Sequence, residues 1–293
     1  MPRRFLLALL GLASVLGCER PLPVTRGIPG EALAAVERWL AGEDVEGPAP
    51  GPAPARDRRL RALGAEVYRL RCTPCHGVSG NGRGPQSGRL SVPARDFTTG
   101  VYELRSTPSG ALPRDEDLYR TVSRGLRGTA MLPWSWLTEV ERWAVVGHVK
   151  SFSDRFESEG AGPPVAVPPH PTPSAGLEAR GTLSYRSAGC PSCHGERGDG
   201  DGPSAGTLRR DSGEPVRPRP FSEGRFLRGS TPEELWLTLH TGLDGTPMPS
   251  YETLPADDLY AIGAEVRALA GGGGPRGEDA EERLGFGIDL LGR

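Results

Sequence analysis

The sequence predicts an all-α fold built from two tandem modules. Two observations support helices: apolar residues recur every three or four positions in several segments, and alternating strand-like runs are hardly found. A third observation is an internal repeat with a spacing of 117 residues. A repeat of this length indicates two similar units in one chain, and it therefore sets the number of domains.

The repeat is defined by residues of the same kind at equivalent places. The pairs that stand 117 positions apart are Gly64 and Gly181, Tyr68 and Tyr185, Met131 and Met248, and Trp143 and Tyr260. We assign the two modules to residues 57–155 and 178–270. The first module carries residues 107–113 in addition, which lengthen the loop before its middle helix.

Each module is predicted to contain a first helix that leads into a cysteine motif, a loop rich in glycine and proline, a middle helix, a methionine loop and a final helix. The middle helices are expected at residues 116–124 and 232–241, and the final helices at 138–152 and 256–269. Thr231 is a suitable N-cap, because its hydroxyl can accept a bond from a free backbone N–H. Pro232 then fits the first turn.

One glycine in each module is expected where two helices cross closely. Gly64 and Gly181 stand in the first helices, and we expect them to face Trp143 and Tyr260 in the final helices. Glycine has no Cβ, so two backbones can approach closely at such a position. We interpret both glycines as packing residues.

The motif C-x-x-C-H occurs twice, once in each module. Its residues are Cys72, Cys75 and His76 in the first copy, and Cys190, Cys193 and His194 in the second. The motif is typical of covalent haem attachment: two thiols form thioethers with the haem vinyl groups, and the histidine binds the iron. A zinc half-site and a redox-active cysteine pair are the alternatives for a single copy. Two equivalent copies favour two covalently bound haem c groups.

Met131 and Met248 are the candidates for the second axial ligand of each iron. Each follows a Gly-Thr turn in the loop before the final helix, and the chain has no other methionine beyond Met1. Histidine and methionine together are the ligands of electron-transfer cytochromes c. The alternative is a methionine that fills a gap in the core.

Three other histidines compete for the iron. They are His148, His170 and His240, and none of them recurs in the other module. We therefore interpret them as surface or packing residues. His240 comes closest to a ligand by position, because it precedes Met248 by eight residues.

Residues 1–18 are typical of a secretory leader, with Arg3 and Arg4 before a short apolar run. Cys18 ends this run in a lipobox-like sequence, which predicts cleavage, lipidation and attachment to a membrane surface. Ordinary cleavage and an uncleaved anchor are the alternatives. We expect an exported protein, lipid-anchored on the periplasmic side of a membrane.

The remaining segments connect or flank the modules. Residues 19–56 are expected to hold a short helix at 29–42 and a proline-rich spacer. Residues 156–177 form a linker whose six prolines favour an extended strut. Residues 271–293 are predicted to be a flexible tail, to which we assign no role.

Charge differs between the modules although the whole chain has a net charge of -2. Residues 56–155 carry 17 basic and 10 acidic side chains, whereas residues 178–270 carry 10 basic and 14 acidic ones. The difference is consistent with an ordinary mixed surface or with two faces that meet different partners. No nucleic-acid-binding motif is found.

The two cysteine motifs, the two methionine loops and the repeated helices resemble those of a di-haem cytochrome c with two class I-type modules. The resemblance covers residues 57–155 and 178–270. It implies an all-α fold around each haem, six-coordinate low-spin iron and transfer of single electrons between a redox donor and an acceptor of a respiratory chain. The first module departs from the pattern at Leu132, which separates Met131 from Pro133.

Two alternatives to a mobile electron carrier remain open at this point. One is a di-haem enzyme of the peroxidase or thiosulfate-oxidising type, which requires an open or unusual iron ligand. The other is a fixed cytochrome c subunit of a respiratory complex. The sequence does not distinguish a mobile electron carrier from a fixed subunit, because both need the same haem sites.

Overall fold

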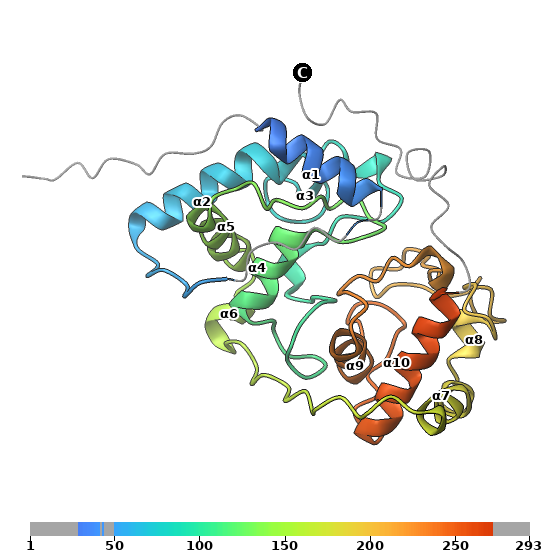
Figure 1. The fold of residues 1–293 in the computed structure, drawn as a ribbon. Coiled ribbons are helices and arrows are strands. Elements are labelled where there is room, and N and C mark those ends of the chain that lie inside the picture. The colour runs from blue at the N-terminus through green and yellow to red at the C-terminus, as the bar shows by residue number, and fades with distance from the viewer. Residues whose placement is uncertain (1–28, 42, 44–49, 272–293) are drawn as a thin grey trace, which may run out of the picture.

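The structure is a computed structural model that describes residues 29–41, 43 and 50–271, and it confirms the all-α prediction (Figure 1). Within these residues the backbone forms helices and loops, with only two isolated bridges. The α-helices are α1 (Gly30–Leu40), α2 (Arg58–Arg71), α3 (Thr73–His76), α4 (Asp115–Arg124), α5 (Glu139–Lys150), α6 (Arg155–Ser158), α7 (Ala175–Ser187), α8 (Pro191–His194), α9 (Pro232–Thr241) and α10 (Ala256–Gly271). The short 3-10 helices are η1 (Ser87–Arg89), η2 (Phe97–Thr99) and η3 (Phe221–Glu223).

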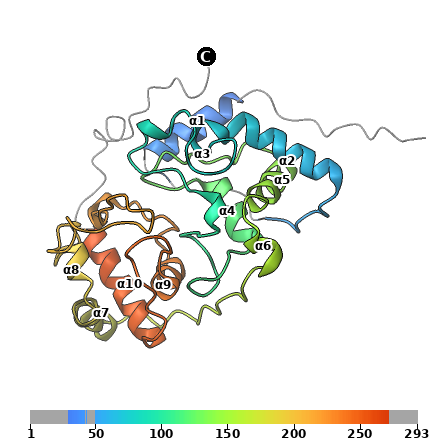
Figure 2. The same cartoon turned by 180° about the vertical axis from the view of Figure 1, so that it is seen from behind.

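Two hydrophobic cores correspond to the two copies of the repeat. In the first, α2 packs against α5, and Val67 and Val146 are buried at its centre. In the second, α7 packs against α10, and Leu259 and Ile262 have almost no exposed surface. Figure 2 shows from behind the same separation into α2–α6 on one side and α7–α10 on the other. The module boundaries themselves stay a prediction.

Hydrogen bonds of side chains at the N-caps determine where several helices begin. The Asp57 carboxylate accepts a bond from the Leu60 N–H at 2.7 Å, at the start of α2. Thr138 and Thr231 each form a capping box with the glutamate three residues later, at the starts of α5 and α9. These bonds satisfy N–H groups that have no partner inside the helix. The predicted N-cap at Thr231 is therefore confirmed.

The expected close crossings exist in both modules, but the residue that each glycine faces differs from the prediction. A Cβ on Gly64 would lie 2.1 Å from the carbonyl oxygen of Ala144, and one on Gly181 would lie 2.5 Å from that of Ala261. The nearest neighbours are thus backbone groups one residue after Trp143 and Tyr260. Packing of the aromatic rings sets the rotation of the final helix about its axis. This rotation decides which residue of that helix meets the glycine.

The linker between the modules lies against both of them. Its Val165 N–H donates to the Ser106 carbonyl of the first module at 2.7 Å. In the second module the Tyr260 hydroxyl donates to the Pro168 carbonyl of the linker. Residues near the middle of the linker are therefore hydrogen-bonded to both modules.

The predicted leader with Cys18 and most of the predicted tail lie outside the described residues. Among the helices that are described, none has the length and apolar character needed to cross a membrane.

We predict that Gly64→Ala destabilises the protein, because the Ala144 carbonyl occupies the place of the new methyl group. Overpacking of this kind lowers the free energy of unfolding by about 1–3 kcal/mol. Denaturant unfolding of the holoprotein measures the change. Gly147→Ala in the facing helix α5 is the matched control, since its Cβ would meet nothing closer than 4.0 Å. Equal stability of both variants would contradict the close crossing.

Candidate cofactor-binding sites

The first cysteine motif forms the short helix α3 directly after α2. The Cys75 and His76 N–H groups donate to the Cys72 carbonyl at 3.2 and 2.9 Å. Residues three and four positions apart lie on the same face of a helical turn. Both thiols and the imidazole are therefore presented together by one turn of backbone.

The second motif repeats this geometry in α8. The Cys193 and His194 N–H groups donate to the Cys190 carbonyl at 3.2 and 2.9 Å, which are the same distances as in α3. In both modules a glycine follows the histidine with a positive φ, 75° at Gly77 and 79° at Gly195. Such a φ is unfavourable for other residues, so the turn out of the motif requires glycine.

A backbone carbonyl orients the first histidine. His76 Nδ1 lies 3.1 Å from the Arg95 carbonyl oxygen, and the His76 ring stacks on Phe97 with ring centres 4.4 Å apart. Because a carbonyl can only accept, Nδ1 carries the proton and Nε2 keeps its lone pair for a metal. Burial lowers the pKa of His76, so the ring is neutral at physiological pH.

The second histidine is similarly half-buried and stacked. His194 packs on Phe221 with ring centres 4.8 Å apart, and burial lowers the pKa of His194 to about 4. Its Nδ1 is buried without a hydrogen-bond partner among the described residues. Neutral imidazole is the form that binds metal ions. The predicted histidines therefore have the state that iron ligation needs.

A tyrosine hydroxyl holds the end of each motif in place. Tyr68 donates to the Gly77 carbonyl, and Tyr185 donates to the Gly195 carbonyl, both at 2.8 Å. Both tyrosines are fully buried. The repeat identified these residues as equivalent, but no role could be assigned to them from the sequence, because the bond depends on how the first helix lies over the motif.

The cysteines of the two motifs form no disulfide. Burial raises the pKa of Cys72 to about 12 and that of Cys190 to about 11. Two thiols and one neutral imidazole on a single turn are the donor set for one covalently attached haem. Each module therefore fits haem c.

The two predicted methionine ligands lie in loops of the same conformation. The Leu126 N–H donates to the Met131 carbonyl at 2.8 Å, and the Leu243 N–H donates to the Met248 carbonyl at 3.1 Å. Each methionine N–H in turn donates to the threonine hydroxyl two residues before it, at 3.0 and 3.2 Å. The shared geometry makes the two sulfurs equivalent by position. Their binding to iron stays a prediction.

Each of the three other histidines has an aromatic neighbour. His148 lies against Tyr68 with ring centres 5.0 Å apart, and His170 meets Tyr260 edge-on at 5.0 Å. His240 stacks on Trp236 at 4.6 Å. These contacts are the packing roles that the sequence favours for them.

An all-α fold that presents two thiols and an imidazole on one helical turn defines the class of c-type cytochromes. Residues 60–149 match the family described as cytochrome C oxidase, cbb3-type, subunit III. A chain of the Kuenenia stuttgartiensis reducing HAO-like protein complex Kustc0457/Kustc0458 is 40% identical, with a TM-score of 0.70. The match covers 74% of this chain and 98% of that one. No curated protein matches. The chain belongs to the c-type cytochromes.

We predict that Tyr68→Phe and Tyr185→Phe each destabilise their own module. Each change leaves a buried glycine carbonyl without its donor, which costs about 1–3 kcal/mol. Thermal unfolding of the holoprotein measures the loss. Val78→Ala is the control, because Val78 adjoins Gly77 but is 84% exposed. A loss no larger than that of the control would show that the hydroxyls do not support the motifs.

Proposed function

We propose that this protein is a di-haem cytochrome c that carries single electrons between redox partners at the extracytoplasmic face of a membrane. The observation that carries the proposal is the equivalence of the two modules. Both cysteine motifs have the same backbone hydrogen bonds, both histidines are neutral and stacked on phenylalanine, and both methionine loops close in the same way. One haem per module follows from this equivalence.

In this proposal the side chains of each module hold one haem. The thiols of Cys72 and Cys75 bind the first, and those of Cys190 and Cys193 bind the second. When bound, haem c supplies reversible one-electron chemistry at its iron. His76 and His194 would each bind one iron through an imidazole nitrogen.

The methionines complete the proposed sites. Met131 and Met248 would each supply a thioether sulfur to one iron, which would leave no position open to a substrate. Electron transfer then needs no bond making or breaking, which favours the carrier over an enzyme. Lipidation at Cys18 keeps the protein at the membrane where its donor or acceptor lies.

A fixed subunit of a larger redox complex is the second candidate. The similar Kuenenia stuttgartiensis chain is part of a reducing HAO-like protein complex, and this chain covers nearly all of its length. The match also spans 74% of this protein, a share that a single module does not account for. A similar complex here would make the partner permanent. The haem sites would stay the same.

We predict two haem groups per chain, one in each module. Replacement of Cys72 and Cys75 by alanine should remove one, and replacement of Cys190 and Cys193 should remove the other, because each pair serves a separate turn of helix. Intact-mass spectrometry of the purified protein counts the groups. Loss of both haems from either double variant, or a wild-type chain with one haem, would contradict the assignment.

Oxidised wild-type protein should show two low-spin haems with histidine and methionine ligands, and it should not react with peroxide. Optical and EPR spectra at controlled potential test this expectation. Met131→Leu and Met248→Leu should each convert one haem to a state that binds added imidazole. A wild-type haem that is already high-spin or reacts with peroxide would favour the enzyme.

The fixed-subunit alternative is tested by gentle extraction of the protein. Its isolation as a stable complex with another redox protein would favour the subunit over the carrier.

A further inference from the structure

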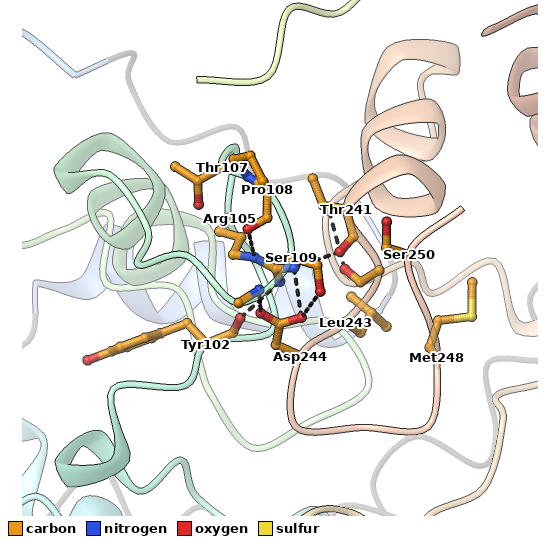
Figure 3. A network of polar contacts seen from close by, with 12 residues as sticks. Tyr102, Arg105, Thr107, Pro108, Ser109, Thr241, Leu243, Asp244, Met248 and Ser250 are labelled. Carbon is orange, nitrogen blue, oxygen red and sulfur yellow. Dashed lines mark hydrogen bonds and ion pairs between the residues drawn. The ribbon is translucent and has the colours of Figure 1, made fainter. Parts of the chain in front are cut away.

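A fully buried guanidinium lies at the boundary between the two modules (Figure 3). Arg105 of the first module donates Nη2 to the Thr241 carbonyl at 2.6 Å and to the Asp244 carboxylate at 2.7 Å. Its Nε donates to the Pro108 carbonyl at 3.1 Å, and Nη1 to the Tyr102 carbonyl at 3.3 Å. A buried cation is stable only when its donors are satisfied in this way. The boundary is therefore a specific contact.

The carboxylate of Asp244 is held by three donors from the first module. Besides Arg105, the Ser109 hydroxyl donates to it at 2.9 Å and the Gly110 N–H donates at 2.8 Å. Ser109 and Gly110 belong to residues 107–113, the segment that the second module lacks. This extra segment therefore serves the other module, by supplying donors to its carboxylate.

The second module also donates a hydrogen bond to the main chain of Arg105. Arg228 of the second module is 8% exposed and donates Nη2 to the Arg105 carbonyl at 2.7 Å. Arg105 is thus fixed both by its side chain and by its main chain. Displacement of one module relative to the other would break both sets of bonds.

Asp244 stands at one end of the loop that carries Met248. The Leu243 N–H, next to Asp244, donates to the Met248 carbonyl, and the Thr246 N–H donates to the Leu243 carbonyl, both at 3.1 Å. These bonds join the loop into one closed turn. Anchoring its Asp244 end to the first module therefore also restricts where the methionine end lies.

The corresponding loop of the first module is held differently. Arg127 takes the place of Asp244, and it offers no carboxylate to the other module. Its carbonyl accepts one bond from Arg219 of the second module. The two methionine loops therefore have the same backbone hydrogen bonds but different contacts across the boundary.

We propose that Arg105, Ser109 and Asp244 are positioning residues for Met248, so that the ligand of the second haem is held in place by the first module. The inference rests on the proposed function, since it takes Met248 as an axial ligand. The carboxylate itself touches no iron ligand. It acts through the closed turn between Leu243 and Met248.

The test replaces Asp244 by asparagine in the full-length holoprotein and titrates the oxidised form with imidazole. We expect the concentration of imidazole that half-saturates one haem to fall roughly tenfold, because charge-assisted bonds to the loop are lost. The other haem should be unchanged. NMR of the reduced protein should show a weakened methyl resonance for Met248 only. Met131→Leu and Met248→Leu assign the two resonances.

Two further variants make the result specific. Ser109→Ala removes one donor to the Asp244 carboxylate at an exposed position, so it should also lower the imidazole concentration that half-saturates the haem. It can replace Asp244→Asn in the test if that variant yields too little holoprotein. Asp258→Asn is the matched control in the same module, since Asp258 binds Arg180 and Ser184 away from the methionine loop. It should lower the unfolding temperature without changing the imidazole affinity.

Unchanged imidazole affinity in both Asp244→Asn and Ser109→Ala would overturn the inference, as would equal weakening of both haems. These outcomes leave the proposed function intact, provided that the wild-type protein shows two methionine resonances. A wild-type protein without the Met248 resonance would instead overturn the proposed ligation, and the inference with it.

Discussion

The constraint on which the structure depends is that two thiols and an imidazole must reach fixed points of one rigid ring. One helical turn meets it, because the Cys75 and His76 N–H groups both donate to the Cys72 carbonyl. The neighbouring elements then secure this turn. The first helix leads directly into this turn. A tyrosine hydroxyl donates to the carbonyl of the glycine that follows the turn, and a phenylalanine ring stacks on the histidine of the turn.

The same constraint explains why the first and final helices touch so closely. The tyrosine can reach the glycine carbonyl only if the first helix is fixed, and the contact with the final helix fixes it. Gly64 and Gly181 permit this contact, since any side chain there would collide with a backbone carbonyl. Packing at the crossing and chemistry at the cysteine motif are thus parts of one arrangement.

Much of this arrangement is encoded locally, and the sequence predicted it. Cysteine motifs, N-caps such as Thr231 and helical periodicity all act within a few residues, and the repeat placed them twice. The contacts across the modules could not be predicted in this way. Arg105 and Asp244 are 139 residues apart and have no equivalent pair in the repeat, so only the folded chain brings them together. The partners of Gly64 and Gly181 were predicted one residue away for a similar reason, since tertiary packing sets helix rotation.

The boundary between the modules also bears on how electrons reach the protein. Buried ion pairs contribute little net stability, because desolvation offsets attraction, but they reject other arrangements. Arg105 with Asp244, and the linker bonded to both modules, therefore favour one relative placement over a flexible tether. The first module carries more basic than acidic side chains, and the second more acidic than basic ones. In the proposed electron carrier, such a difference in charge would steer a donor and an acceptor of opposite charge preference to different modules.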